Sequence, residues 1–503
     1  MAVDLQMLRS KAMNGSAWAI LEKFSLQIVQ FIVSVVLARL LEPRDYGLIA
    51  ITAIFTGISS AITDGGFEKS LIREVEISPL QVNSVFYMNA LLGVVMMAVL
   101  FFSSPALAAF FNEPALVPLL RVVSIGLFIN ALGQVQRVLL MKELHFKKIS
   151  VSQIFSSLIG GLTGIIMAYK GFGVWALVGS GLVGQTLMVL FFWIRSGWYP
   201  EWKFSISSLR PMWRYGSNVL LTSLLFFIML QFNNFIIGKL FSKSELGLFN
   251  RGGRLPEFII SVIQSIILKM AFPLFVKVQG ERVQLEQVVR KTVRVTAFIA
   301  FPLLALLLSN SHDIMIALFT AKWSGSILFL ELFCLAALFD PFVAIYRELI
   351  LANGKARLFL KVYILTSLVE IGAVLLLARY GILYIVWATI AGKALQYFTC
   401  MGVTARHTGI PWQRQLKWIE PYFFISAVVA IFIKTIGYPL EHTSLSLVVR
   451  LLLKLGSGSL LYLLLAYLTK LEELSFARNF YQLFGKKILK YPYSLIFPSN
   501  RDA

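Results

Sequence analysis

Residues 37–50, LARLLEPRDYGLIA, return about 200 residues later as IGKLFSKSELGLFN, residues 237–250. Each copy ends an apolar run, passes through a short polar turn and begins another apolar run. A glycine stands at the same place after the turn, Gly47 in the first copy and Gly247 in the second. Self-similarity at a fixed offset indicates that one structural unit has been duplicated.

The repeat extends beyond this turn in both directions. It reaches back to Gly15–Ser16 and Gly216–Ser217, and further on GFGVWALVG around Trp175 resembles YGILYIVWATIAG around Trp387. These matches predict two copies of six helices each. Because six is even, both copies enter the membrane in the same direction. Parallel repeats of that kind form two lobes that bind substrate between them.

The composition identifies the solvent of these helices as lipid. The chain of 503 residues is 58% hydrophobic and 14% charged, with a mean hydropathy of +0.78, whereas soluble domains carry about 25% charged residues. Apolar stretches of this length are read as membrane-spanning helices. We expect spans at residues 15–40, 46–64, 83–110, 116–136, 149–169, 173–194, 216–241, 247–272, 292–309, 324–345, 358–378, 382–404, 419–437 and 446–468.

The sequence therefore predicts an all-α integral membrane protein with about fourteen transmembrane helices, in two parallel six-helix lobes around a central cavity plus two C-terminal helices. We expect the N-terminal lobe in residues 1–200 and the C-terminal lobe in 201–410. The two additional helices then occupy 411–470, and residues 471–503 form a cytoplasmic tail.

The net charge of +21 follows from this topology and does not require nucleic acid as a partner. Basic residues collect in the expected inward segments, for example Lys142, Lys147, Lys148, Lys486, Lys487 and Lys490. Several of the expected outward loops hold only a single basic residue. The positive-inside rule then predicts that both termini are cytoplasmic. Cys334 and Cys400 form neither a disulfide framework nor a metal motif, so we expect no cofactor.

Four motifs resemble those of a known transporter family. They are GSAWAILEKF at residues 15–24, LARLLEPRDYGLIA, TDGGFEKSLIR at 63–73, which follows the second span and is expected to be a loop, and NRGGRLPE at 250–257. Together, over roughly residues 10–470, they resemble the polysaccharide-transporter branch of the MOP flippase superfamily, which includes the flippases for colanic-acid and O-antigen repeat units.

The resemblance implies a function in a bacterial inner membrane. Its cargo would be undecaprenyl pyrophosphate bearing a short glycan, turned from the cytoplasmic to the periplasmic leaflet by alternating access for exopolysaccharide or lipopolysaccharide synthesis. Membrane lipids and the polysaccharide polymerase machinery are the further partners that it suggests. No ATP-binding motif is visible, so a proton or sodium gradient is the energy source to consider. We expect a transporter and no enzymatic activity.

The first helix carries one polar stripe. Lys23, Gln27, Gln30 and Ser34 are spaced i, i+4, i+7 and i+11, which places them on one helix face. A polar face in a membrane helix must meet protein or water, so Lys23, Gln27 and Gln30 are candidates for substrate binding. Alternatively, Lys23 reaches the interface or pairs with Glu22.

The seventh and eighth helices offer further candidates. Arg251 and Arg254 are nearly one turn apart, and the planar guanidinium suits the oxygens of a diphosphate. Alternatively, Arg251 anchors the interface and Arg254 pairs with Glu257. Gln231 and Asn234 could bind sugar hydroxyls or join helices to each other.

Charged residues near the inner end of the second helix form another group. Lys69 and Arg73 could receive an arriving pyrophosphate, or they could only enforce topology, and Arg137 has the same status. We include Arg73 among the substrate-binding candidates. Asp64, beside them, is a candidate for ion coupling.

Glu370 is the second candidate for ion coupling, because it lies near the middle of the eleventh span. Lys393 sits at a comparable depth in the twelfth span. A fixed Glu370–Lys393 pair is the alternative to proton uptake. Asp340 on the tenth span raises the same question.

Three rival functions remain open. Drug or cation exporters of the multidrug-and-toxin-extrusion type share the two-lobe build but favour cavity carboxylates, whereas the candidates here include Lys23, Arg251 and Arg254. Lipid II flippases would carry nearly the same kind of cargo, and only the motif resemblance favours a repeat-unit flippase over them. A membrane-embedded polymerase or glycosyltransferase usually carries acidic residues in a large outward loop, and every outward loop expected here is short.

Overall fold

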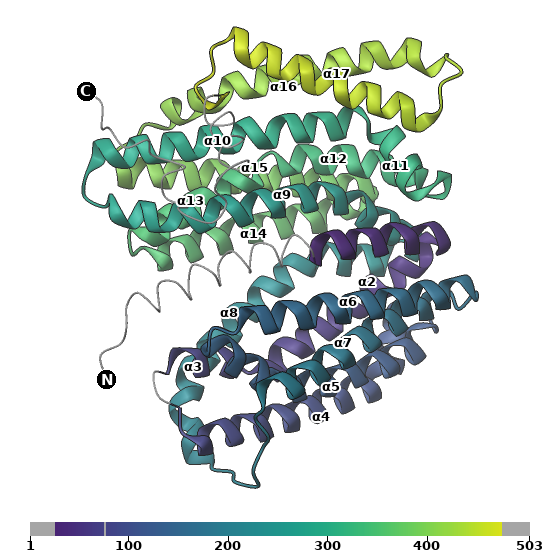
Figure 1. Cartoon of the computed structure of the whole chain (residues 1–503), viewed down its shortest axis with the longest axis vertical. Coiled ribbons are helices and arrows are strands. Elements are labelled where there is room, and N and C mark those ends of the chain that lie inside the picture. The colour runs from purple at the N-terminus through teal and green to yellow at the C-terminus, as the bar shows by residue number, and fades with distance from the viewer. Residues whose placement is uncertain (1–25, 75–76, 475–503) are drawn as a thin grey trace. The chain divides into compact units, whose positions relative to one another are not determined.

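The computed structural model describes residues 26–74 and 77–474, and in these ranges the chain forms helices and no strand (Figure 1). The first helix is described from Leu26 to Leu40. The chain divides into two compact units. The N-terminal unit comprises Met1–Asn250 with Leu318–Trp323, and the C-terminal unit comprises Arg251–Ala317 with Ser324–Ala503.

The N-terminal unit is a bundle of long helices. Its elements are α2 (Pro43–Asp64), α3 (Phe67–Arg73), α4 (Pro79–Phe110), α5 (Leu116–Lys142), α6 (Phe146–Tyr169), α7 (Val174–Ser196) and α8 (Ile206–Leu240). Helix α4 packs on α5, α6 packs on α7, and α5 also packs on α7. Helix α2 packs on both α5 and α8, so it is central to the unit.

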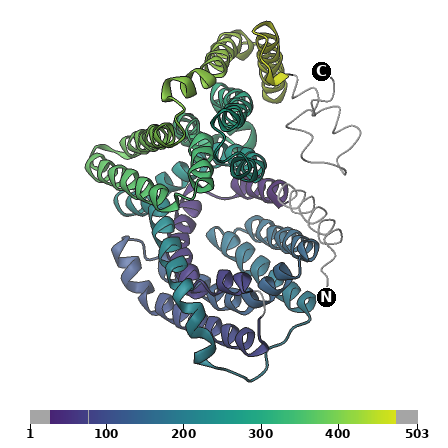
Figure 2. The same ribbon diagram turned by 90° about the vertical axis from the view of Figure 1, so that its left-hand side faces the viewer.

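The C-terminal unit contains most of α9 and the helices that follow. These are α9 (Lys243–Lys277), α10 (Arg282–Ser309), α11 (Ser311–Phe319), η1 (Ala321–Ser326, in the N-terminal unit up to Trp323), α12 (Ile327–Ala337), α13 (Asp340–Ala352), α14 (Ala356–Leu377), η2 (Ala378–Tyr380), α15 (Ile382–Thr408), α16 (Trp412–Glu441) and α17 (Leu447–Leu468). Helix α10 packs on α16, and α14 packs on α15. Figure 2 shows several of these helices nearly end-on.

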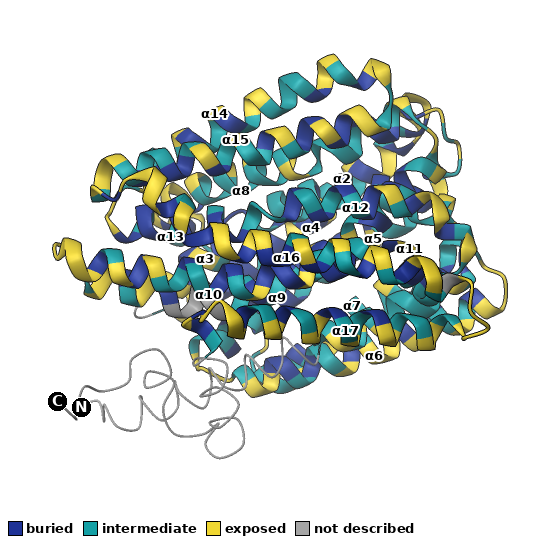
Figure 3. Ribbon diagram, turned by 90° about the horizontal axis from the view of Figure 1, so that it is seen from above, coloured by how far each residue is buried: buried dark blue, intermediate teal, exposed yellow. Residues whose placement is uncertain are grey.

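Among the described residues, eleven helical segments are long and apolar enough to cross a membrane. Within the described residues, each of the fourteen expected spans falls on a helix or, for residues 324–345, mainly on the pair α12 and α13, and residues 15–25 of the first span lie outside the described residues. The membrane-helical class is confirmed, while the count of fourteen stays a prediction. Exposed positions recur along α14 and α16 (Figure 3), and many of them carry large apolar side chains, as a lipid-facing surface requires.

The repeated turn begins its second helix in the same way in both copies. The backbone N–H of Glu42 donates to Oδ2 of Asp45 at 3.0 Å, and the backbone N–H of Ser242 donates to Oε2 of Glu245 at 2.9 Å. In each copy a carboxylate three residues later accepts a backbone N–H at the start of the helix. Local structure thus follows the sequence repeat.

The repeated glycines make reciprocal contacts. A Cβ atom on Gly47 would lie 1.7 Å from the carbonyl oxygen of Lys243, and a Cβ on Gly247 would lie 1.8 Å from that of Pro43. The first turns of α2 and α9 therefore touch backbone to backbone. Both contacts join equivalent positions of the two repeats, as expected where two similar elements are related by a local two-fold axis.

The segment TDGGFEKSLIR, expected to be a loop, contains the helix α3. Gly65 and Gly66 end α2 with φ values of +55° and +72°, a left-handed conformation that glycine adopts readily. The chain then resumes as a helix that buries Phe67 and Leu71. A Cβ on Gly66 would lie 2.2 Å from the carbonyl oxygen of Gly216, so α8 passes directly against this turn.

Candidate functional site

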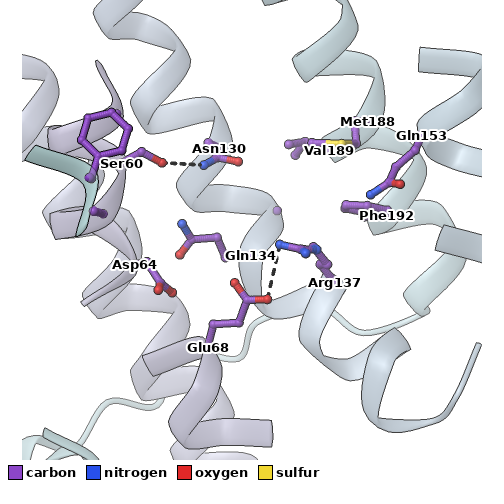
Figure 4. A pocket seen from close by; sticks show the side chains of 14 residues that line it. Ser60, Asp64, Glu68, Asn130, Gln134, Arg137, Gln153, Met188, Val189 and Phe192 are labelled. Carbon is purple, nitrogen blue, oxygen red and sulfur yellow. Dashed lines mark hydrogen bonds and ion pairs between the residues drawn. The ribbon is translucent and has the colours of Figure 1, made fainter. Parts of the chain in front are cut away.

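The N-terminal unit encloses a pocket of about 570 Å³ (Figure 4). Helices α2, α3, α5, α6, α7 and α8 contribute to its wall. Its polar lining comes from Ser60, Asp64, Glu68, Asn130, Gln134, Arg137 and Gln153. Its apolar lining includes Met188, Val189, Phe192 and Phe227. The volume lies in the range of about 300–1,000 Å³ that is usual for small-molecule sites.

Two glycines let the helices around this pocket approach closely. A Cβ on Gly57 of α2 would lie 1.9 Å from Cζ of Phe227 on α8. A Cβ on Gly133 of α5 would lie 2.7 Å from Cγ2 of Val189 on α7. Glycine at both positions therefore sets the spacing of the pocket walls.

Helix α5 presents a polar face to the pocket. Asn130, Gln134 and Arg137 are spaced i, i+4 and i+7 and so share one side of the helix. Nδ2 of Asn130 donates to Oγ of Ser60 at 3.4 Å, and Nδ2 of Asn89 donates to Oε1 of Gln134 at 2.8 Å. The carbonyl of Gln134 is thereby used within the protein, and its amide nitrogen is left for the pocket.

Three charged side chains line the pocket. Nη1 of Arg137 lies 3.3 Å from Oε1 of Glu68, which makes an ion pair between α5 and α3. Oδ1 of Asp64 and Nε of Arg137 are buried and have no hydrogen-bond partner among the described residues. Because an unsatisfied buried polar atom costs about 1–3 kcal/mol, these atoms indicate a site where solvent or a ligand supplies the partner.

Of the predicted candidates that the structure describes, Asp64 and Arg137 line the pocket. The exposed Arg73 lies elsewhere in the N-terminal unit, with its guanidinium 4.7 Å from the centre of the Tyr215 ring, where it makes a cation–π contact. A role for Arg73 in substrate binding stays a prediction.

Gln231 and Asn234 form a chain of amide hydrogen bonds. Nδ2 of Asn234 donates to Oε1 of Gln231 at 2.7 Å, and Nδ2 of Asn250 donates to Oδ1 of Asn234 at 3.1 Å. The chain joins α8 to the first turns of α9, as expected of polar residues that connect membrane helices. These contacts occupy part of the hydrogen-bonding capacity of Gln231 and Asn234.

Arg251 and Arg254 have different surroundings on α9. The side chain of Arg254 is 61% exposed and lies 3.5 Å from Glu257, which is the alternative pairing expected from the sequence. Because its side chain is exposed, Arg254 remains accessible to a ligand, and an exposed pair of this kind contributes little to stability. Arg251 is buried.

The polar stripe of the first helix is described only in part. Lys23 lies outside the described residues. Gln27 is half-buried and Gln30 is exposed, and neither lines the pocket. Their proposed role in binding therefore stays a prediction.

In the C-terminal unit, Lys393 pairs with Asp340 and not with Glu370. Nζ of Lys393 lies 2.6 Å from Oδ2 and 2.7 Å from Oδ1 of Asp340. Glu370 packs against α15 at Gly392, one residue before Lys393, but makes no ion pair within 4 Å with a described residue. The alternative of a fixed Glu370–Lys393 pair is therefore wrong in this conformation, because the carboxylate at the start of α13 takes the ammonium.

The pocket amides were missed in the sequence although a signal was present. Asn130, Gln134 and Arg137 follow the same i, i+4, i+7 spacing that selected the stripe on the first helix. Gln153 on α6 carries no such pattern, and only the packing of α6 beside α7 brings it to the pocket.

Three curated relatives are similar to this chain, each at 24% identity. The teichuronic acid biosynthesis protein TuaB of Bacillus subtilis aligns over 91% of this chain and 95% of its own length. For the lipopolysaccharide biosynthesis protein WzxC of Escherichia coli the shares are 73% and 75%. For the succinoglycan biosynthesis transport protein ExoT of Rhizobium meliloti they are 61% and 62%.

Solved structures share the fold at low sequence identity. The lipid II flippase MurJ, in an inward closed conformation, matches with a TM-score of 0.70 and 14% identity over 89% of this chain and 98% of its own. A multidrug resistance MATE transporter of the MOP superfamily, in an inward-facing conformation, matches with a TM-score of 0.59 and 14% identity over 78% of this chain and 99% of its own. The chain therefore has the fold of MOP-superfamily transporters.

A family model provides the assignment. The model described as polysaccharide biosynthesis protein matches residues 36–328, which is more than half of the chain and includes the pocket. The expected resemblance to polysaccharide transporters is confirmed at the level of the family. The chain belongs to this family of polysaccharide biosynthesis proteins.

Proposed function

We propose that this protein is a flippase that moves undecaprenyl-pyrophosphate-linked oligosaccharide repeat units from the cytoplasmic to the periplasmic leaflet of a bacterial inner membrane. The observation that carries the proposal is the polar, charged pocket inside a unit of membrane-spanning helices. A glycan has many polar groups and cannot cross hydrocarbon unaided. Charged and amide side chains inside a membrane bundle are expensive, and they are expected where a polar cargo passes.

The relatives support transport as the activity. ExoT is named a transport protein, and MurJ, whose fold this chain shares, is named a flippase of lipid II. A transporter moves its cargo from one leaflet to the other and neither forms nor breaks a covalent bond in it. We therefore favour transport over the alternative of a polymerase or glycosyltransferase. In this proposal a polysaccharide polymerase uses the repeat units after they have been translocated.

We place both termini in the cytoplasm. Helix α5 then ends on the cytoplasmic side at Lys142, and α6 begins there beside Lys147 and Lys148. The Glu68–Arg137 end of the pocket lies toward this basic side, where a cargo with a diphosphate would arrive. We retain residues 1–200 and 201–410 as the two lobes that move in alternating access.

We propose the transmembrane proton or sodium gradient as the energy source. Asp64 in the pocket and Glu370 on α14 are the candidates, because neither has a cation within ion-pairing distance among the described residues. A membrane carboxylate in that situation can take up a proton or a cation and release it on the other side.

A second candidate function is export of an organic cation, as in multidrug transporters. One observation favours it: the pocket holds two carboxylates, Asp64 and Glu68, against one guanidinium, Arg137. The argument that cavity charge separates the two functions does not hold for this pocket. Membership of a polysaccharide biosynthesis family is what favours a glycan.

Deletion of the gene in its bacterial host tests the proposal. Lipid-linked repeat units should accumulate on the cytoplasmic leaflet, and wild-type protein supplied from a plasmid should clear them. Arg137→Ala should fail to clear them, whereas Arg210→Ala, at an exposed arginine of the same unit outside the pocket, should succeed. Unchanged lipid intermediates in the deletion strain would contradict the proposal and direct attention to drug sensitivity.

A further inference from the structure

We propose that the pocket of the N-terminal unit binds the saccharide part of the cargo and not its diphosphate, and that the saccharide portion in the pocket is uncharged and rich in hydroxyl groups. This inference rests on the proposed function and assigns one part of the cargo to one site. Three features of the pocket carry it: its charge, its hydrogen-bonding groups and its apolar wall.

The charge of the pocket disfavours a diphosphate. Asp64 and Glu68 both line it, and the single guanidinium of Arg137 already lies 3.3 Å from Glu68. A diphosphate would have to displace Glu68 and remain close to two carboxylates. Like charges in a partly buried site repel strongly, because water screens them less there.

The hydrogen-bonding groups suit hydroxyls. A sugar hydroxyl donates and accepts at the same time, so it needs both kinds of partner in one place. The pocket supplies acceptors at Oδ1 of Asp64 and at the side-chain carbonyl of Asn130, and it supplies donors at the amide nitrogen of Gln134. A site of phosphate recognition would instead present donors alone.

A further amide and an apolar surface lie across the pocket. Figure 4 shows Gln153 and Phe192 on the far side of Arg137 from Asp64 and Gln134. Gln153 has no hydrogen-bond partner among the described residues, so both ends of its amide are available. The C–H face of a sugar ring can lie on Phe192 while the hydroxyls at its edge meet the amides.

The size of the pocket fits this assignment. About 570 Å³ accommodates a short saccharide, and no long apolar channel is needed because the polyprenyl chain can remain in lipid. The pocket would therefore bind the sugars nearest to it, and its side-chain amides would determine which glycan is recognised.

The test is a binding measurement on the full-length protein in lipid nanodiscs. The first probe is the host's repeat-unit oligosaccharide, released from its carrier by mild acid. The second probe is undecaprenyl pyrophosphate without sugar, and the third is the organic cation tetraphenylphosphonium. The variants are Gln134→Glu, which keeps the acceptor for Asn89 but removes the donors, and Asn130→Ala. Gln284→Leu, at an exposed glutamine on α10, is the control.

We expect wild type and Gln284→Leu to bind the oligosaccharide equally, and each pocket variant to bind it about tenfold more weakly, the effect of losing one or two hydrogen bonds. The affinity for undecaprenyl pyrophosphate should change by less than about twofold in Asn130→Ala. Near-native thermal unfolding of both variants shows that they are folded, and a variant that misfolds is replaced by Gln153→Leu, whose side chain bonds to no described residue.

Three results would overturn the inference: no oligosaccharide binding by wild type, weaker binding of the pyrophosphate lipid alone in Asn130→Ala, or competition for the pocket by tetraphenylphosphonium but not by oligosaccharide. The leaflet assay in the deletion strain is independent of this test. A flippase that fails here keeps its function and loses only the assigned subsite, whereas a failed leaflet assay removes the flippase function itself.

Discussion

At the scale of single residues, Arg137 combines two roles: it forms an ion pair with Glu68 and it lines the pocket. It pairs with Glu68 through one nitrogen, and its Nε remains buried without a partner. Its side chain is 41% exposed, so the ion pair contributes only modestly to stability. The importance of Arg137 should therefore appear in transport more than in folding.

We predict that Arg137→Ala lowers the translocation rate of lipid-linked repeat units at least about tenfold, because two pocket carboxylates lose their counter-charge. Arg137→Lys should retain part of the rate, since it keeps the charge but not the planar fork. Transport measured beside protein abundance checks this. Equal loss of abundance and transport in Arg137→Ala would reduce the role of Arg137 to folding.

Glu370 is the residue through which we test coupling. It lies against Gly392, beside the Lys393–Asp340 pair, without an ion pair of its own to a described residue. We predict that Glu370→Gln removes the dependence of transport on the ion gradient, because the amide cannot exchange a proton or bind a cation as a carboxylate does. Glu257→Gln, at an exposed glutamate, is the control. Transport that still responds fully to an uncoupler in Glu370→Gln would exclude this residue.

Some candidate residues predicted from the sequence line the pocket, whereas others do not. Asp64 was found because a carboxylate at the inner end of an apolar span is conspicuous, and it lines the pocket. Gln231 and Asn234 were equally conspicuous, but they bond to each other and to Asn250. Sequence spacing tells which side chains share a helix face, whereas the partner of that face depends on packing between helices.

At the scale of elements, the turn that occurs twice is held by two glycines. A side chain at Gly47 or Gly247 would place Cβ less than 2 Å from a carbonyl oxygen of the other repeat. The helices would have to separate to admit it. The fold thus depends on these positions more than on the charges of the turn.

We predict that Gly47→Ala and Gly247→Ala each destabilise the protein by about 1–3 kcal/mol, the usual effect of overpacking. Gly456→Ala on α17 is the matched control, because the added methyl group meets no described atom within 4 Å apart from the neighbouring backbone of its own helix. That control should be neutral or stabilise the protein by up to about 1 kcal/mol, since alanine is the better helix former. Thermal unfolding in detergent measures all three, and a neutral Gly47→Ala would contradict the close contact.

Helix α17 is fixed to α11 by a buried ion pair. Nζ of Lys454 lies 2.8 Å from Oδ2 of Asp313, and both side chains are 5% exposed. Burial alone would raise the pKa of Asp313, but the hydrogen bonds from Lys454 and His312 outweigh it and hold that pKa below its usual value. A lowered pKa in the folded state stabilises the protein above the unfolded pKa, and the contribution is lost as pH falls through the folded value.

We predict that Lys454→Met destabilises the C-terminal unit by about 3–5 kcal/mol, because it leaves a buried carboxylate without its partner. The double variant Lys454→Met with Asp313→Asn should recover much of this loss, since no buried charge remains. Wild type should lose stability as the pH falls below about 4, the ordinary pKa of an aspartate in the unfolded chain, and the double variant should lose less. Unfolding curves against pH check both points, and identical acid sensitivity of the two proteins would contradict the role of this pair.

Most elements could be predicted from the sequence because membrane helices are long and apolar. Helix α9 was found although Arg251, Arg254 and Glu257 interrupt the apolar pattern near its start. Helix α3 was missed, because the segment that contains it, with Gly65 and Gly66 near its start, was expected to be a loop. In the structure these glycines only separate two helices.

At the scale of the whole molecule, the duplication seen in the sequence predicts two lobes of similar build. The equivalent N-terminal bonds of α2 and α9 and the reciprocal glycine contacts agree with such a duplication. The compact N-terminal unit extends to Asn250 and includes α8, which packs on α2. A lobe that begins at residue 201 therefore stays a prediction about the bodies that move during transport.

The most direct test of the flippase function uses purified protein in liposomes that contain undecaprenyl-pyrophosphate-linked repeat units, with an ion gradient across the membrane. A glycan-modifying enzyme added outside reports how much of the lipid reaches the outer leaflet. We predict that wild-type protein exposes the inner-leaflet pool several-fold faster than protein-free liposomes, and that Arg137→Ala does not. A rate equal to that of protein-free liposomes, in vesicles whose protein is folded and supplied with either a proton or a sodium gradient, would contradict the flippase function.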